Sequence, residues 1–109
     1  APLTYRVPRS RVRDLSNEEE AVAIIISAEL RIDPKDLPKI RAFAAVMVEK
    51  TNTLEKGPCI TYAFSEDFNE PGLVRAFEVW ESDEALAEHF KTQHMADFQE
   101  GMKGITVKG

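Results

Sequence analysis

The segment CITYAFSEDFNEPGLVRAFEVWES, residues 59–82, decides the fold. In its first part Ile60, Tyr62 and Phe64 alternate with other residues, which is typical of a strand with two different faces. The residues DFNEPG at 67–72 are turn-forming types, and alternation resumes after them. The sequence therefore predicts strands over 59–66 and 73–81. The second strand is expected to place four residues on one face, Val74, Ala76, Glu78 and Trp80.

A helix is expected on each side of these two strands. Before them, apolar residues recur three or four positions apart from Leu37 to Leu54, and Gly57 and Pro58 would end that helix. After them, Ser82 is a typical N-cap residue. Residues at steps of four follow it and predict one helix that ends at Gly101 or Gly104: Leu86, Phe90, His94, Phe98 and Met102.

Residues 16–31 admit two interpretations. Residues 16–19 have the spacing of a helix capping box, but Val22, Ile24 and Ile26 are β-branched and suit a pleated sheet. We predict a buried strand over 21–31 and a short last strand over 105–108. The order strand, helix, strand, strand, helix, strand indicates an α+β, ferredoxin-like fold with an antiparallel sheet.

Charge divides the chain into two parts. Residues 1–13 contain four arginines and no acid, whereas the whole chain of 109 residues has a net charge of −5. We expect residues 1–20 to form a basic arm and residues 21–109 to form one domain. Tyr5 and Val7 are strand formers, so we predict that residues 3–7 pair with a sheet edge. The arginines beyond that strand are expected to meet acidic groups: Arg9, Arg11 and Arg13.

Composition excludes several classes of function. An acidic body argues against a general nucleic-acid binder, since affinity for phosphates comes from clustered cations. The longest apolar run, residues 21–28, is far shorter than a bilayer requires, so we expect no membrane insertion. Cys59 is a lone cysteine and cannot form an internal disulfide. We therefore expect a reducing, cytoplasmic location.

One block of residues carries a family resemblance. The block consists of Glu78, Trp80, Glu81 and Ser82, followed by Leu86, His89 and the run TQHM at 92–95. It lies on the second predicted strand and the helix after it, and it resembles the antibiotic biosynthesis monooxygenase family, which includes quinol monooxygenases. The resemblance implies a dimeric α+β barrel, in which two ferredoxin-like sheets pack face to face. It also implies a cofactor-independent monooxygenase of a small aromatic or quinol substrate, with no metal or flavin.

The candidate site residues follow from this resemblance and from their chemistry. His94 lies on the apolar stripe and is the expected general base, because burial keeps an imidazole neutral and able to accept a proton. A structural interpretation stays open beside it, in which His94 is a histidine at the edge of the core that is hydrogen-bonded to a carboxylate, with Glu78 as the expected partner. Trp80 is the expected wall for stacking of an aromatic ring. Tyr62 and Asn52 are expected to orient a phenolic oxygen.

His89 is the remaining candidate for the substrate site. It is five residues from His94, which places the two rings about 140° apart on a continuous helix, on different faces. Its neighbours Glu84 and Glu88 indicate a wetter face and favour a structural role. A break in the helix could bring the two rings together. A pair of metal ligands on a helix prefers a spacing of four, and no cysteine or carboxylate stands at a recognised metal spacing, so no bound metal is expected.

Two other functions stay open at this point. One is a non-catalytic dimeric protein that binds a small molecule in the same pocket. The other is an isomerase of a small phosphorylated ketone. That anionic substrate would require convergent cations in the pocket, and Arg75 and Arg41 are the candidates.

Overall fold

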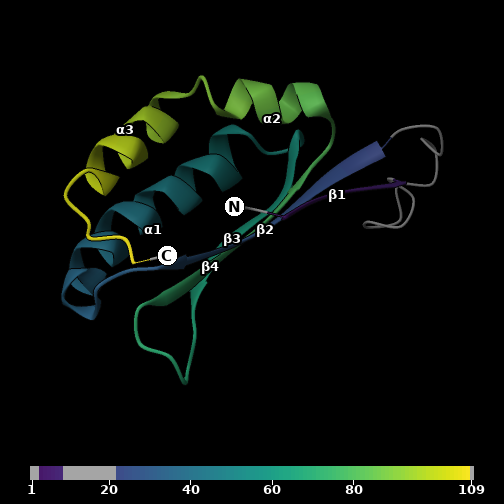
Figure 1. Cartoon of the computed structure of the whole chain (residues 1–109). Helices are drawn as coiled ribbons and strands as arrows, with labels where there is room; N and C mark the ends of the chain where they lie inside the picture. Colours follow the sequence, from purple (N-terminus) through teal and green to yellow (C-terminus); the bar gives the residue numbers. More distant parts are fainter. Residues whose placement is uncertain (1–2, 9–21, 109) are drawn as a thin grey trace.

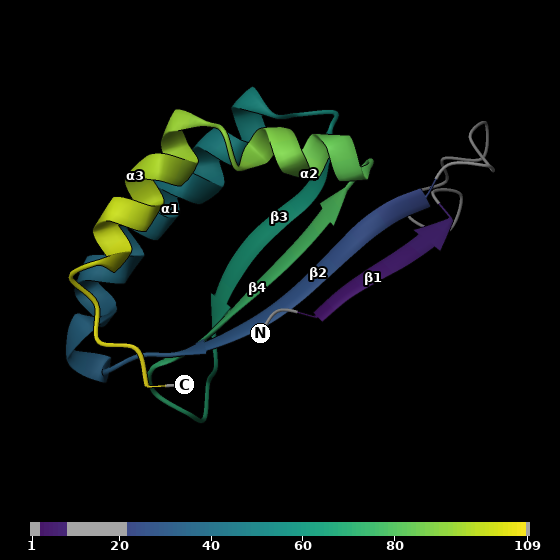
Figure 2. The ribbon, with the colours of Figure 1, turned by 45° about the horizontal axis from the view of Figure 1, so that its top comes forward.

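The computed structural model describes residues 3–8 and 22–108. Four strands form one antiparallel sheet in the order β1-β2-β4-β3, made of β1 (Leu3–Pro8), β2 (Val22–Arg31), β3 (Cys59–Glu66) and β4 (Leu73–Trp80). The helices lie together on one side of this sheet (Figures 1 and 2). The α+β class and the antiparallel sheet predicted from the sequence are therefore confirmed.

The helix before the β3–β4 pair lies where the sequence placed it. Helix α1 (Leu37–Leu54) follows a single 3-10 turn, η3 (Pro34–Asp36). That turn begins at Asp33, whose carboxylate accepts a hydrogen bond from the backbone N–H of Lys35 at 3.1 Å. The apolar stripe of α1 faces the sheet and buries Ile40, Ala44 and Met47.

The second helix is interrupted, so the prediction of one continuous helix was wrong. It consists of α2 (Asp83–His89) and α3 (Gln93–Met102). Thr92 causes the break: its hydroxyl oxygen accepts from the N–H of Met95 at 3.2 Å, which caps α3. The same hydroxyl donates to the carbonyl of His89 at 2.7 Å, which satisfies the end of α2.

The N-terminal strand occupies the sheet edge beside β2. β1 pairs antiparallel with β2 of the same chain, with Tyr5 opposite Ile25, so the predicted pairing of this segment with a sheet edge is confirmed. Arg6 also bonds to Asp83 at 3.0 Å. The remaining arginines of the predicted arm, Arg9, Arg11 and Arg13, lie outside the described residues.

The predicted last strand over 105–108 is not formed. Its segment makes one isolated bridge, between Val107 and Ile32. The tail instead crosses the start of α1, because the N–H of Thr106 donates to the Asp36 carboxylate at 2.9 Å and its carbonyl accepts from the N–H of Asp33. β1 therefore takes the edge position that a last strand beside β2 would fill.

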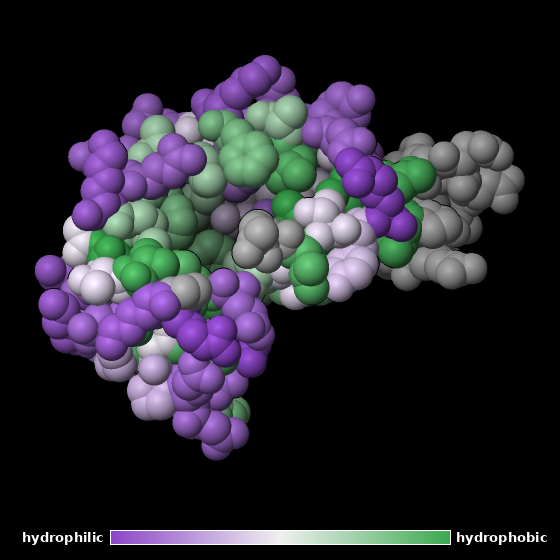
Figure 3. Space-filling view, in the orientation of Figure 1, coloured by the Kyte–Doolittle hydropathy of each residue, from purple (hydrophilic) through white to green (hydrophobic). Residues whose placement is uncertain are grey.

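The two faces of the sheet have different surroundings. On the covered face, beneath the helices, Ile24, Trp80 and Met47 belong to one buried cluster. On the opposite, open face, Tyr5 and Phe77 remain 49% and 46% exposed. In the space-filling view, apolar surface runs between the helix layer and the sheet and is bordered by hydrophilic residues (Figure 3). Within the described residues, no helix combines the length and the apolar character needed to cross a membrane.

Candidate functional site

Three helix ends bring a carboxylate and two imidazoles together beneath the helix layer. Glu55 is the C-cap residue of α1, His89 ends α2, and His94 lies in the first turn of α3. One Glu55 oxygen, Oε2, lies 2.7 Å from His89 Nδ1 and 2.6 Å from His94 Nε2. The two histidines are 1% and 5% exposed. With protons on the nitrogens that face it, both rings donate to this single oxygen.

The position of Glu55 explains why it has two donors. A carboxylate at the C-terminal end of a helix lies at the negative end of the helix dipole, where it is unfavourable. A poorly solvated carboxylate also requires hydrogen-bond donors to compensate for the water it has lost. His89 and His94 supply those donors, so the cluster holds the end of α1 against the junction of α2 and α3.

This cluster corrects three expectations about the histidines. The 140° separation assumed one continuous helix, and the break at Thr92 instead turns both rings toward Glu55. His89 lies in a buried site rather than on a wetter face, because α2 packs its final turn against Trp80. The partner of His94 is Glu55, and Glu78 bonds elsewhere.

The cluster also contains the ligand types of a metal site. Among the described residues, the ligand atoms of Glu55, His89 and His94 all lie within 4.8 Å of one another. Yet the N···O separations of 2.6 and 2.7 Å are those of charge-assisted hydrogen bonds. Ligand atoms about 2.0–2.1 Å from a tetrahedral zinc would stand about 3.3 Å apart. The described geometry is therefore that of a hydrogen-bonded cluster.

A second group of polar side chains lies on the covered face of β3 and β4. The indole N–H of Trp80 donates to Glu78 Oε1 at 2.9 Å. Burial raises the pKa of Glu78, although the bond from Trp80 and the nearby His89 oppose this shift. Burial likewise raises the pKa of Tyr62, so its phenol stays protonated and can act as a donor. Trp80 packs edge-on against Tyr62 and within 4.5 Å of the His89 ring.

Tyr62 and Glu78 line a cavity of about 190 Å³, here called the inner cavity, between the sheet and the helices α1 and α3. The rest of its wall is apolar and includes the rings of Phe64 and Phe98 and the side chain of Met95. A volume below the ~300–1,000 Å³ of most ligand pockets fits a small ring system. The inner cavity thus offers an apolar space with one proton acceptor and one donor.

The remaining predicted site residues lie outside this wall. Trp80 orients the Glu78 carboxylate, and its ring is packed among Tyr62 and His89 instead of facing the inner cavity. Asn52 is exposed, and its amide donates to the backbone carbonyl of Tyr62 at 3.0 Å, which ties α1 to β3. His94 likewise does not line the inner cavity.

Sequence reasoning missed Glu55, Phe64 and Phe98 as parts of this region. A signal for Glu55 was present, because an acidic residue at the end of a helix, just before Gly57, requires a compensating partner. The two phenylalanines had no comparable signal. Their alternation and helical spacing are those of ordinary core residues, and only the packing of β3 against α3 makes them walls of a cavity.

The two arginines considered for an anionic substrate do not converge. Arg75 is on the open face, where it bonds to Asp67 at 2.7 Å and to Glu29 at 3.2 Å. Arg41 makes two bonds of 2.8 Å to Glu66. Neither lines the inner cavity, so nothing in this geometry favours the isomerase.

An antiparallel sheet covered on one face by helices, with a small cavity between the layers, defines a ferredoxin-like α+β protein with an interior site. The sequence model of the antibiotic biosynthesis monooxygenase family matches residues 23–101. The chain belongs to this family.

Known proteins agree with this assignment at the level of fold. A candidate antibiotic biosynthesis monooxygenase of Caulobacter crescentus superimposes with a TM-score of 0.73 at 22% identity, covering 80% of each chain. Another, of Bacteroides thetaiotaomicron, gives 0.74 at 21% identity, covering 80% of this chain and 81% of its own.

A curated relative is an uncharacterized protein of Synechocystis, 29% identical over 85 residues, which are 78% of this chain and 56% of the relative. The chain thus spans little more than half of the length of that relative.

Proposed function

We propose that this chain is a cofactor-independent monooxygenase of a small phenol or quinol. The observation that carries the proposal is the shared wall of the inner cavity, where Glu78 and Tyr62 are set in apolar surroundings. Family membership adds the expectation of monooxygenase chemistry. A raised pKa makes Glu78 a stronger base than an ordinary carboxylate, and it brings the protonation step closer to neutral pH.

The residues have distinct roles in this proposal. Glu78 accepts the proton of the substrate hydroxyl, and the Tyr62 phenol donates a hydrogen bond to a substrate oxygen. The resulting anion is electron-rich enough to reduce molecular oxygen, and the apolar wall excludes water. In the balanced reaction, a quinol and O₂ yield a hydroxylated quinone and one water.

His94, the base predicted from the sequence, has a different role here. Its Nε2 is bonded to Glu55, and it lies outside the wall of the inner cavity. We therefore assign the proton acceptor to Glu78, with His94 and His89 holding Glu55. Trp80 holds the Glu78 carboxylate in place through its indole N–H.

Oxygen uptake with a panel of phenols and quinols, with and without a chelator, tests the proposal. We expect turnover that the chelator does not change and that falls at least about 100-fold in Glu78→Gln. Glu29→Gln, a matched change on the open face, is expected to retain activity. If Glu78→Gln stays active and a folded His94→Gln does not, His94 is the base and our assignment is wrong.

The same panel separates the alternative function. If no compound supports oxygen uptake while one raises the melting temperature of the protein, the chain is a non-catalytic binding protein. In that case the Glu78→Gln variant is expected to lose the thermal shift as well.

We also propose that the chain forms a homodimer. The open face of the sheet leaves Leu3, Tyr5 and Phe77 about half exposed, and no described helix covers them. Packing this face against a second copy would bury these side chains, and stable dimers typically bury more than ~1,000 Å² in total. A cytoplasmic location also stays a prediction.

A further inference from the structure

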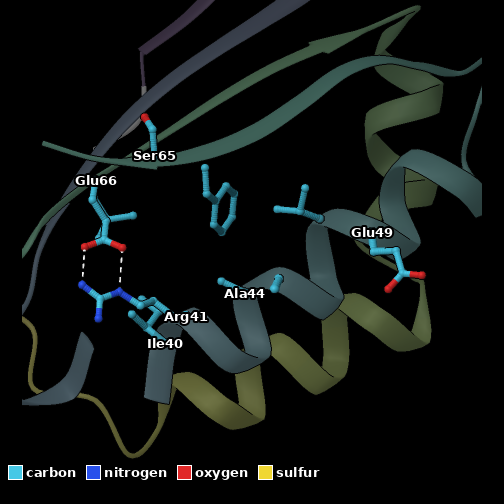
Figure 4. A pocket seen from close by; sticks show the side chains of 10 residues that line it. Ile40, Arg41, Ala44, Glu49, Ser65 and Glu66 are labelled. Carbon is cyan, nitrogen blue, oxygen red and sulfur yellow. Dashed lines mark hydrogen bonds and ion pairs between the residues drawn. The ribbon is translucent and has the colours of Figure 1, made fainter. Parts of the chain in front are cut away.

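A second, larger cavity lies between α1 and β3. This space, here called the outer groove, has a volume of about 410 Å³. Figure 4 shows α1 on one side and β3 on the other, with Ala44 and Ile40 directed into the space from the helix. Most of its wall is apolar, with six apolar residues among the ten that line it: Ile40, Ala44, Ala45, Val48, Phe64 and Val74.

The outer groove adjoins the inner cavity. Both are lined by Ile40, Phe64 and Val74, so these side chains separate one space from the other. A molecule whose ring occupies the inner cavity and whose substituent lies in the outer groove would have to pass between these side chains, with the Phe64 ring turned aside. With such a molecule bound, the two spaces would form one elongated site with a polar inner end and an apolar outer part.

The charges of the outer groove favour an uncharged, apolar occupant. Arg41 is the cation on its wall, and both its Nε and an Nη donate to Glu66 at 2.8 Å (Figure 4). Its guanidinium is therefore already neutralised by a bidentate partner. Glu49, on the other side of Ala45, would repel an anion. The small side chains of Ala44 and Ala45 leave the room that a chain of methylene groups needs.

We propose that the outer groove binds an alkyl or prenyl side chain of the substrate, whose aromatic ring occupies the inner cavity. The inference rests on the proposed function for the chemistry of the ring, and it narrows the substrate class to alkyl-substituted phenols and quinols. Burial of a hydrocarbon chain in the outer groove increases the affinity in proportion to the length of the chain.

Calorimetric titration under anaerobic conditions tests this inference without turnover. The probes are hydroquinones with unbranched alkyl chains of increasing length, each below its micelle concentration. We expect the affinity to rise by up to about fourfold for each added methylene group until the outer groove is full. An affinity that does not depend on chain length would overturn the proposal.

Two matched variants on α1 locate the effect. Ala45→Trp places a large ring in the outer groove at an exposed position, so it should abolish the dependence on chain length while retaining the affinity for unsubstituted hydroquinone. Ala42→Trp, also at an exposed position on the same helix but outside the groove, should leave the whole series unchanged. Unaltered chain-length dependence in Ala45→Trp would contradict our assignment.

The outcomes distinguish this inference from the proposed function. Chain-length dependence without any oxygen uptake retains the outer groove as a binding site and rejects the monooxygenase. Oxygen uptake with short quinols, together with an affinity that does not depend on chain length, retains the monooxygenase and rejects the outer groove as a binding site. A change of molar mass by light scattering in Ala45→Trp alone would indicate that a second copy of the chain occupies the outer groove, and the inference would be wrong.

Discussion

The two faces of the sheet shift the pKa values of their carboxylates in opposite directions. On the covered face, Glu78 has a raised pKa because it is buried, and its carboxylate has one described donor, Trp80. On the open face, Arg75 bonds to Asp67 and Glu29. There the bond from Arg75 and two backbone N–H groups lower the pKa of Asp67 to about 2. Burial thus dominates on one face and hydrogen bonding on the other.

The comparison shows where changes should matter. Water screens exposed ion pairs, which contribute only about 0–1 kcal/mol each. A buried polar group that loses its partner keeps the full cost of its lost hydration. Substitutions beneath the helices are therefore expected to lower the free energy of unfolding more than substitutions on the open face, unless a second chain covers that face.

The largest effect is expected at Glu55. Glu55→Ala removes the acceptor of both buried imidazole N–H groups, so the free energy of unfolding should fall by about 3 kcal/mol. Urea denaturation measures the change. Glu49→Ala, an exposed position on the same helix, is the control and should change stability by less than about 0.5 kcal/mol. Equal values for the two variants would contradict the importance of the cluster.

The second largest effect is expected for dimerisation through the open face. Phe77→Asp places a charge in the proposed dimer interface and should weaken dimerisation by more than about tenfold. Light scattering should show a mass near twice 12.3 kDa for the unaltered chain and a shift toward 12.3 kDa for the variant. Phe68→Asp changes a phenylalanine that is fully exposed in the β3–β4 turn and serves as the control. A monomeric unaltered chain at micromolar concentration would refute the dimer.

A smaller effect is expected for the pH dependence of stability. Because the folded-state pKa of Glu78 is raised, the folded chain binds more protons than the unfolded chain above the ordinary value of 4.5. Glu78 therefore lowers stability as the pH rises from about 4.5 to its folded-state pKa, and it has no effect below that window. Glu78→Gln should flatten this slope and be the more stable form at pH 7.

Urea denaturation between pH 4 and pH 7 measures that slope. Glu84→Gln, at an exposed position in the first turn of α2, provides the comparison. If Glu78→Gln follows the same pH dependence as the unaltered chain, the carboxylate does not titrate differently in the folded state.

The smallest effect is expected for the ion pair between β1 and α2. Arg6 and Asp83 are 3.0 Å apart, and their side chains are about 60% exposed. A double-mutant cycle with Arg6→Ala and Asp83→Ala should give a coupling of about 0–1 kcal/mol that decreases in high salt. A salt-independent coupling well above that range would show that this pair is shielded from water.

Much of the fold could be predicted from local patterns. Strand β3 begins and ends at the predicted residues, and β4 differs by one residue at its end. Alternation, helical spacing and the turn residues at 67–72 act over a few positions, so they can be recognised without tertiary structure. One helix was predicted across the break at Thr92 because the i+4 stripe continues through it, although a threonine three residues before Met95 is itself a capping signal.

Only part of the candidate site could be predicted from the sequence, and its hydrogen-bond partners could not. The sequence named Tyr62 and Glu78 as site residues, and both line the inner cavity, but it gave Glu78 the wrong partner. Glu55 joins His89 and His94 across 34 and 39 residues of chain. No spacing rule reaches that far.

The sequence by itself determined where α1, β3 and β4 lie, because backbone geometry repeats over two or 3.6 residues. Tertiary structure alone decided that β1 takes the edge beside β2 and that three helix ends share one carboxylate oxygen. It alone also left the inner cavity and the outer groove on either side of Phe64. These features depend on how the helices pack on the sheet, and each is formed by residues from segments that are distant in the chain.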